Sequence, residues 1–438
     1  MTAWSNDLLD LIIQHDQTSC LYPIIRNELE TGESSLMFVR SIAVIAFSLA
    51  FALPISAKEP LKVFILVGQS NMQGHAEITT FDHIGMDPVT APLLKEMRTA
   101  NETPRVCDEV WISSIGNDAS GDEYYGQLTA GYGAKGRGTK IGPEFTFGIY
   151  MQKHLDEPIL IIKTAWGGKS LHTDFRPPTS GPYEFNEGQL ESLKKQGKNI
   201  DQAKADRANA SGHYYRLMLD HVNKVLKDIK RVCPAYDSEI GHELAGFVWF
   251  QGWNDMVGRD VYPNRDQAGG YDLYSTLMAQ FIRNVRRDLA APKLPFVIGV
   301  MGAGGPVAKY GPSRQRYSEI HQNFRDAMAA PALLPEFKGN VTAVLTENYW
   351  DAELAELKAR GGKVKARSQE LSQDKSFTRT QREEALSKFR AELYSPRETE
   401  ILKGSSNAEY HYNGSAKIMA LIGKGFADSI EKMSQSPK

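Results

Sequence analysis

Short apolar runs recur along the chain, separated by longer stretches whose apolar residues have helical spacing. Each run is mainly apolar and rich in β-branched residues; the runs are residues 61–67, 159–163, 246–250, 295–301 and 341–346. Such runs suit strands that are covered on both faces, because neither face then meets water. Strands of this kind that alternate with helices favour parallel pairing through crossover connections. The sequence therefore predicts an α/β fold, a three-layer α/β/α sandwich with a central parallel sheet.

Helices are predicted most clearly where apolar residues recur three and four positions apart, at residues 213–230, 273–289 and 416–431. Two segments interrupt the alternation. Residues 117–140 are rich in glycine and polar side chains, which predicts a long surface loop near the mouth of the site. Residues 351–403 are dense in lysine, arginine and glutamate, which predicts a solvated helical hairpin or lid inserted into a single domain of residues 58–435.

An apolar segment lies near the N-terminus but begins only at Met37. A short basic region ends at Arg40, residues 41–53 are apolar, and Ala57 supplies a small residue for cleavage. The run is too short to cross a bilayer, which needs about 20 residues. We interpret residues 37–57 as a signal peptide, with the mature chain secreted or periplasmic. Residues 1–36 are then a start assigned too far upstream or a disordered extension; the alternative is a cytoplasmic segment ahead of an uncleaved anchor.

Charge and cysteine content exclude several classes of function. The formal net charge is -2, and no segment interleaves dense basic residues with aromatics, so we expect no nucleic-acid partner. Neither a Cys-x-x-Cys nor a His-x-x-x-His spacing occurs, so the sequence gives no support for a metal site. The sequence leaves open whether Cys107 and Cys233 form a disulfide, and it leaves the oligomeric state open.

Chemically active residues follow the predicted strands at their carboxyl ends, where ligands bind in open parallel sheets. Ser70 lies in Gly-Gln-Ser-Asn-Met after the first strand, and a Gly-Gly pair ending at Gly168 follows the second. Gln251 follows the third, and His411 precedes the last helix. Together these residues supply a nucleophile, a proton acceptor and several N–H donors for an oxyanion, which are the requirements of acyl transfer.

These motifs resemble those of a known family. Gly-Gln-Ser-Asn-Met after the first strand, Gly-Gly after a later one, Trp-Phe-Gln-Gly before an acidic position and a late histidine are similar to the sialate O-acetylesterase branch of the SGNH hydrolases, close to carbohydrate esterase family six. The resemblance covers residues 61–430. It implies a flavodoxin-like sandwich and a secreted esterase that removes acetyl groups from carbohydrate, with no metal or organic cofactor.

Carried over residue by residue, the resemblance implies a role for each motif. Ser70 would attack the acyl carbon, and His411 would accept its proton and return it to the leaving sugar hydroxyl. The backbone N–H groups of Ser70 and of Gly168 or Gly167, with the side-chain amide of Gln251, would form the oxyanion hole.

The chain departs from the family pattern at two positions. The superfamily often places an aspartate three residues before the histidine, where this chain has Ala408. Glu409 is our candidate for orienting His411; a backbone carbonyl or a carboxylate from another loop would be the alternative. Trp253 stands where relatives often carry glutamate, either as a wall of the substrate pocket or as a packed core aromatic, and Asp255 keeps an acid nearby.

Two other functions remain open from the sequence. One is an exported esterase that acts on lipid or small acyl esters, which would need a long apolar groove. The other is a catalytically silent carbohydrate-binding protein, which the missing aspartate would favour. Aromatic side chains near the motifs, which can stack on sugar faces, favour a carbohydrate ligand over a lipid.

Overall fold

A seven-stranded sheet forms the centre of the computed structural model, which describes residues 59–435. The strand order is β4-β3-β6-β1-β7-β8-β9, with β4 antiparallel to β3 and the remaining neighbours parallel. The strands are β1 (Leu61–Gly68), β3 (Val110–Ile115), β4 (Tyr124–Gln127), β6 (Ile159–Ala165), β7 (His242–Phe250), β8 (Phe296–Val300) and β9 (Val341–Leu345). The predicted parallel sheet is confirmed, as are its five predicted strands. The predictions for residues 1–36 and 37–57 lie outside the described residues.

Two strands at one side of the sheet were not predicted, and their sequences explain why. The β3 run is interrupted by Ser113 and Ser114, so it is not apolar throughout. The β4 strand lies inside residues 117–140, where the prediction of a loop without strands is wrong. Its side chains are alternately half-buried and exposed, because an antiparallel edge strand has one face in water. Residues 140–141 also form a short strand, β5 (Lys140–Ile141), paired with β2 (Ala76–Glu77).

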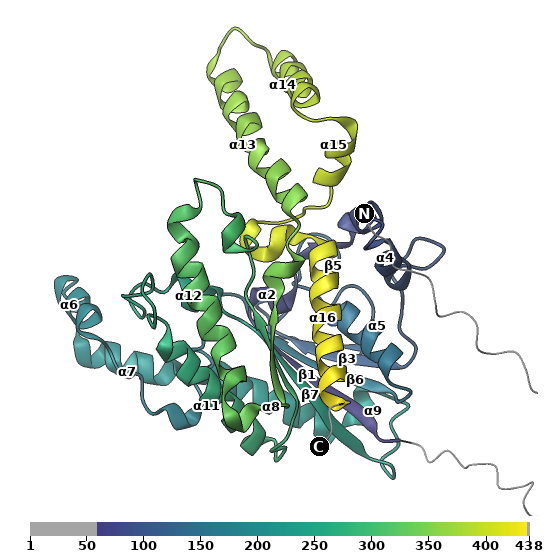
Figure 1. Cartoon of the computed structure of the whole chain (residues 1–438), viewed down its shortest axis with the longest axis vertical. Helices are drawn as coiled ribbons and strands as arrows, with labels where there is room; N and C mark the ends of the chain where they lie inside the picture. Colours follow the sequence, from purple (N-terminus) through teal and green to yellow (C-terminus); the bar gives the residue numbers. More distant parts are fainter. Residues whose placement is uncertain (1–58, 436–438) are drawn as a thin grey trace, which may run out of the picture. The chain divides into compact units, whose positions relative to one another are not determined.

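Helices cover both faces of the sheet and make it a three-layer sandwich (Figure 1). One face is covered by α2 (Ser70–Gln73), α3 (Asp82–Gly85), α4 (Ala91–Met97), α5 (Glu144–His154) and α16 (Ala416–Ser434). The other is covered by α8 (His213–Lys227), α9 (Ile229–Val232), α10 (Trp253–Val257), α11 (Asp272–Asp288) and α12 (Ser318–Ala329). Residues along β1 alternate between the two cores, because successive side chains of a strand point to opposite faces.

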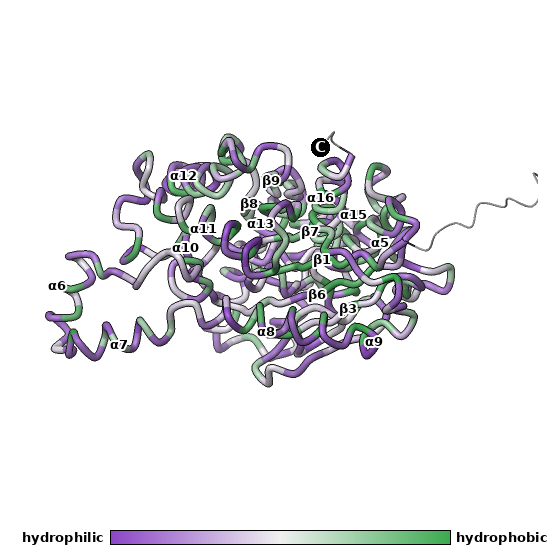
Figure 2. The backbone as a smooth tube through the Cα atoms, turned by 90° about the horizontal axis from the view of Figure 1, so that it is seen from below, coloured by the Kyte–Doolittle hydropathy of each residue, from purple (hydrophilic) through white to green (hydrophobic). Residues whose placement is uncertain are grey.

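Apolar residues concentrate along the central strands, whereas α6 (Glu187–Lys195) and α7 (Ile200–Ala210) are mostly polar (Figure 2). Cys107 packs in the core on one side of the sheet and Cys233 in the core on the other, and both are free thiols. The question that the sequence left open is thus answered by the fold, since the sheet separates the two side chains. No helix within residues 59–435 is both long enough and apolar enough to cross a membrane.

Residues 351–403 form three helices, α13 (Ala352–Gln373), α14 (Arg379–Leu393) and α15 (Pro396–Leu402). Figure 1 shows α13 and α14 as a hairpin that extends away from the sheet. Each helix begins at a capping side chain, which accepts a hydrogen bond from the first turn; the caps are Asp351, Thr378 and Ser395. A small apolar cluster at the base joins the hairpin to α15, and it consists of Leu354, Leu357, Tyr394 and Ile401.

A buried ion pair connects the sheet to α2. The Lys163 ammonium, on β6, is 1% exposed, and it donates to Glu144 Oε2 at 2.8 Å. It also donates to the backbone carbonyls of Gln73 at 2.8 Å and Tyr132 at 2.9 Å. Burial lowers the pKa of Lys163, and the Glu144 carboxylate opposes that shift. Three acceptors thus satisfy the buried charge and tie the end of α2 to α5.

We expect Lys163→Met to lower the free energy of unfolding by about 3–5 kcal/mol, because it leaves the Glu144 carboxylate buried without its cation. The double variant Lys163→Met/Glu144→Leu should regain part of that loss. Urea unfolding followed by circular dichroism measures both. The matched control is Lys195→Met on α6, which pairs with Glu191 at the surface; Lys195 is 72% exposed, and its replacement should change stability by about 1 kcal/mol or less. Equal losses for Lys195→Met and Lys163→Met would contradict the account.

Candidate active site

Ser70 begins α2 directly after β1, so its side chain lies at the carboxyl end of the central strand. A Cβ on Gly68 would lie 2.1 Å from the Phe250 carbonyl oxygen, so only glycine allows β1 to end this close to β7. The carbonyl of Ser70 accepts from Gly74 N at 3.0 Å and closes the first turn of α2. Ser70 is partly exposed, as a nucleophile has to be.

The Gly-Gly turn after β6 passes beside Ser70. A Cβ on Gly167 would lie 3.1 Å from Gln73 Oε1 and 4.0 Å from the Cβ of Ser70. Gly168 has φ +73°, a left-handed conformation that favours glycine, and a Cβ built on it would meet nothing within 4 Å. The structure therefore brings Gly167 to the predicted nucleophile and leaves open space next to Gly168.

Gln251 lies at the tip of β7, but it is 2% exposed and its amide is engaged within the protein. Its Nε2 lies 2.7 Å from Asp255 Oδ2, 2.9 Å from the Lys169 carbonyl oxygen and 3.2 Å from Gln69 Oε1. An amide nitrogen carries two hydrogens, and three acceptors surround it. The geometry thus favours a role in holding the neighbouring loops, and the oxyanion role of Gln251 stays a prediction.

Asp255 is a fully buried carboxylate that fixes the loop after Gly168. Its oxygens accept from Gln251, from the backbone N–H groups of Leu171 at 2.8 Å and His172 at 3.1 Å, and from the Tyr262 hydroxyl at 3.0 Å. These four hydrogen bonds stabilise the charged form of a carboxylate that is buried away from water. Burial and the Asp255 charge raise the pKa of Tyr262 well above its ordinary value, so the phenol stays a donor.

Asn254 is a side-chain amide at the same strand tip that the sequence analysis missed. Its Oδ1 accepts from Gln69 Nε2 at 3.2 Å, which turns the opposite end of the amide outward. Asn254 is partly exposed, and within residues 59–435 its Nδ2 makes no hydrogen bond. Its position directly before Asp255, just after the Gln-Gly motif, was the available signal.

His411 lies in a distorted turn before α16, η8 (Glu409–Gly414). Tyr412 has φ +51° and Asn413 φ +61°, left-handed values that non-glycine residues adopt rarely and at a cost. Buried contacts offset that cost, because the Tyr412 hydroxyl accepts from Gly302 N at 2.7 Å and lies 2.6 Å from Thr346 Oγ1. The turn is therefore anchored to the ends of β8 and β9.

Two contacts bring the His411 turn to α2. Asn71 Nδ2 donates to the Tyr410 carbonyl at 3.1 Å, joining the residue after Ser70 to the residue before His411. The His75 ring stacks on His411, with centroids 3.9 Å apart and planes 3° from parallel. In the described part of the chain the Ser70 hydroxyl makes no hydrogen bond. Catalytic hydrogen bonds are often long in unliganded enzymes and tighten on substrate binding.

Asn407, and not Glu409, contacts the His411 ring. His411 Nδ1 lies 3.0 Å from Asn407 Oδ1. The Glu409 carboxylate forms an ion pair with Arg314 on the far side of the turn. The structure thus does not bring Glu409 to His411, because the turn directs that side chain toward a cation. Ala408, where the family often has an aspartate, has no polar side chain to offer.

Burial sets the charge state of both stacked histidines. It lowers the pKa of His411 to about 4. Burial, followed by the proximity of His411, lowers the pKa of His75 to about 3. Both rings are therefore neutral at neutral pH, and a neutral imidazole is the form that accepts a proton.

A cavity of about 480 Å³ adjoins the His411 turn. It is lined by aromatic, apolar and charged side chains: Trp253, Met256, Val257, Arg259, Arg265, Tyr310, Arg314, Tyr317, Ile320, His321, Glu409 and Tyr410. The rings of Trp253 and Tyr410 lie 5.5 Å apart in its wall. Of the two interpretations of Trp253, the structure places the partly exposed indole at the pocket. Three of the lining side chains are arginines and one is a glutamate, so the pocket is cationic.

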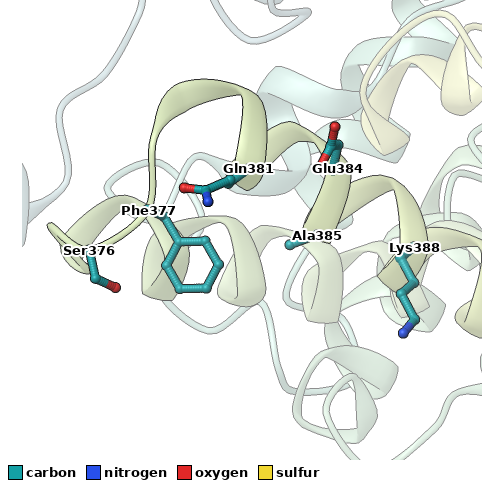
Figure 3. Close-up of a pocket in the computed structure, with 6 residues that line it drawn as sticks. All are labelled: Ser376, Phe377, Gln381, Glu384, Ala385 and Lys388. Atoms are coloured by element: carbon teal, nitrogen blue, oxygen red, sulfur yellow. The ribbon is translucent and has the colours of Figure 1, made fainter.

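A second cavity, of about 410 Å³, lies on α14 and the turn before it (Figure 3). It is lined by Ser376, Phe377, Gln381, Glu384, Ala385 and Lys388, and it contains none of the predicted site residues. Within the described residues, no cluster of histidine, cysteine and acidic side chains is arranged to hold a metal ion. The candidate site is therefore the group of strand tips around Ser70.

Comparisons with known proteins identify the family of the chain. The model of the family described as "Carbohydrate esterase, sialic acid-specific acetylesterase" matches residues 60–334. No curated protein matches the chain in sequence.

Three solved structures resemble the chain. A protein from Arabidopsis thaliana is 18% identical over 66% of this chain and 86% of its own, with a TM-score of 0.35. XAC1771, described as a carbohydrate acetylesterase from Xanthomonas citri, is 13% identical over 66% of this chain and 51% of its own, with a TM-score of 0.34. NanS is 13% identical over 66% and 78%, with a TM-score of 0.35. Because the family match spans more than half of its residues, the chain belongs to the sialic acid-specific acetylesterase family of carbohydrate esterases.

Proposed function

We propose that this esterase removes acetyl groups from carbohydrate by a serine mechanism, with Ser70 as nucleophile and His411 as base. The observation that carries the proposal is the meeting of three separate segments at one edge of the sheet. Ser70 follows β1, Gly167 passes beside it, and the His411 turn is bound to the same helix by Asn71. A nucleophile, N–H donors and a neutral base in one place are the requirements of acyl transfer.

The reaction proceeds in two halves. As Ser70 Oγ attacks the acetyl carbonyl carbon, His411 Nε2 takes the hydroxyl proton; the intermediate then collapses as His411 returns that proton to the departing sugar oxygen. In the second half a water molecule gives a proton to His411 and attacks the acetyl-enzyme. Acetate leaves, and the proton returns to Ser70 Oγ.

Backbone N–H groups of Ser70 and of Gly168 or Gly167 would stabilise the oxyanion in both halves. For the side-chain donor, we propose Asn254 in preference to Gln251. The Asn254 Nδ2 group is the freer of the two, because Gln251 already donates to Asp255 and the Lys169 carbonyl.

The cationic pocket beside His411 would bind the sugar. The Trp253 and Tyr410 rings offer faces for stacking, and Arg259 and Arg314 offer charge-assisted hydrogen bonds to an anionic group. The family description names sialic acid, a sugar that carries a carboxylate. An O-acetylated sugar acid therefore fits this pocket better than the lipid ester of the alternative function, which would leave the arginines buried beside hydrocarbon. The export predicted from residues 37–57 is part of this proposal.

We expect Ser70→Ala to reduce acetate release by at least about 10³-fold, because no other group replaces the nucleophile. The assay measures acetate from a short-chain nitrophenyl ester and from acetylated glycans. Ser120→Ala, in an exposed turn, is the control and should keep wild-type activity. Activity in Ser70→Ala equal to wild type would reject the mechanism. Glycan binding without hydrolysis in the wild type would favour the catalytically silent carbohydrate-binding protein.

We expect Arg314→Gln to raise KM about tenfold for an O-acetylated sugar acid, through the loss of a charge-assisted hydrogen bond. KM for an acetylated neutral sugar should change little. Arg379→Gln on the exposed face of α14 is the matched control and should leave both values unchanged. Steady-state kinetics on the two substrates measures the difference. Equal effects of Arg314→Gln on the KM of both would show that the pocket does not distinguish the acidic sugar from the neutral one by its charge.

A further inference from the structure

The side-chain oxygen of Asn407 occupies the place beside His411 where many serine hydrolases have a carboxylate. The same Oδ1 atom lies 3.0 Å from His411 Nδ1 and accepts from the backbone N–H of Ala408 at 2.7 Å. The Ala408 N–H is a donor, so the amide atom that faces it has to be the oxygen. A shared oxygen acceptor makes His411 Nδ1 the protonated nitrogen. The opposite nitrogen, Nε2, then carries the free lone pair.

We infer that Asn407 is the positioning residue of His411, and that its neutral amide oxygen does the orienting work that an aspartate does in related hydrolases. The inference rests on the proposed Ser70–His411 mechanism and supplies its third member. Asn407 acts only through His411 and contacts no substrate.

The local backbone explains why the residue four positions before His411 faces the ring. The Asn413 carbonyl accepts from the backbone N–H groups of Ser406 and Asn407, both at 3.0 Å, and Asn413 N donates to the Ala408 carbonyl at 3.1 Å. These bonds close a loop around His411, and the left-handed φ angles of Tyr412 and Asn413 are needed to complete it. The loop directs Asn407 inward and Glu409 outward to Arg314.

His75 holds the ring from its flat side. Its ring lies parallel to His411 at 3.9 Å, and His75 Nε2 is buried without a hydrogen-bond partner. Contacts in two directions therefore fix the orientation of the His411 ring: Asn407 contacts its edge, and His75 stacks on its face. The stack involves no repulsion between charges, because burial keeps His75 neutral.

An orienting amide separates two functions that a carboxylate combines. A carboxylate fixes the tautomer and also stabilises the imidazolium by its charge. In a serine protease the change from carboxylate to amide costs about 10⁴-fold in kcat, because the amide selects the wrong tautomer. Here the Ala408 N–H prevents that outcome by holding the oxygen toward the ring. The site therefore keeps the His411 ring oriented but lacks the negative charge that would stabilise its imidazolium form.

The charges around His411 agree with this separation. In the described residues, the ionisable groups around the ring include His75, Tyr410 and the Glu409–Arg314 ion pair. The Lys358 ammonium lies behind Asn407, where it donates to the Asn407 carbonyl at 2.7 Å. Lys140 and Lys163 act on His75 and favour its neutral form. Glu409 is compensated by Arg314, so it offers little stabilisation to an imidazolium.

The test is the pH dependence of kcat/KM for a short-chain nitrophenyl ester in the wild type and in Asn407→Asp. A general base is active when neutral, so activity is lost as pH falls through its pKa. Burial lowers the pKa of His411 to about 4, and the wild type should stay active to about that pH. The carboxylate that Asn407→Asp introduces would favour the imidazolium, and we expect the acid limb to move up by about 1–3 pH units. Asn199→Asp, the same change at the exposed N-cap of α7, is the matched control and should keep the wild-type profile.

An acid limb that does not move in Asn407→Asp, or that moves as far in Asn199→Asp, would overturn the inference. The Ser70→Ala variant separates the two proposals. Full activity in Ser70→Ala refutes the serine mechanism itself, whereas an inactive Ser70→Ala with an unshifted Asn407→Asp refutes only the role of Asn407.

A second measurement does not depend on the folding of an Asn407 variant. The nitrogen chemical shifts of ¹⁵N-labelled imidazole in the wild-type protein report the tautomer, and the His411 signals are assigned by their loss in His411→Gln. We expect a protonated Nδ1 and an unprotonated Nε2 at neutral pH. The opposite tautomer would overturn the inference.

Discussion

The buried Lys163 ammonium is the constraint on which the site depends. A charge removed from water has to be satisfied inside the protein, and its three acceptors belong to three different segments. One is the carbonyl of Gln73, the last residue of the helix that Ser70 begins. Satisfying the lysine therefore fixes the helix that carries Ser70 against β6 and α5. A four-residue helix could not hold such a position by its own stability, because isolated short helices are unstable in water.

Asp255, in α10 just after β7, plays the corresponding part on the other side of β1. Its carboxylate collects hydrogen bonds from Gln251, from the loop that follows Gly168 and from Tyr262. The two buried charges thus lie near the carboxyl ends of β6 and β7 and hold the turns that carry N–H donors. Donors that are already held in place need no reorganisation as the oxyanion develops, and this is the main source of electrostatic catalysis.

The sequence predicted the features that depend on pattern, and missed those that depend on individual dihedral angles. Five strands were predicted because each is mainly apolar, with only isolated polar residues; β3 was missed because two adjacent serines, Ser113 and Ser114, interrupt it, and β4 because half of its residues face water. Ser70 was predicted because ligands bind where parallel strands end, whereas His411 was predicted from its place before the last helix and from the family resemblance. The partner of His411 depends on the left-handed turn at Tyr412 and Asn413, which hydrophobic periodicity does not encode. The Asn-Gly pair at the end of that turn was the available signal.

The buried charges of Lys163 and Asp255 therefore hold the turns of this site in place, whereas the proposed proton transfer uses a neutral base with a neutral partner. That division follows from burial. A carboxylate at residue 408 directed at His411 would be a desolvated anion, and it would need donors beyond the ring itself. Asn407 needs fewer, because its oxygen already accepts from Ala408 N and from the ring. The amide thus orients His411 without adding a charge that the turn would have to stabilise, and the cationic pocket beside it remains available for an anionic sugar.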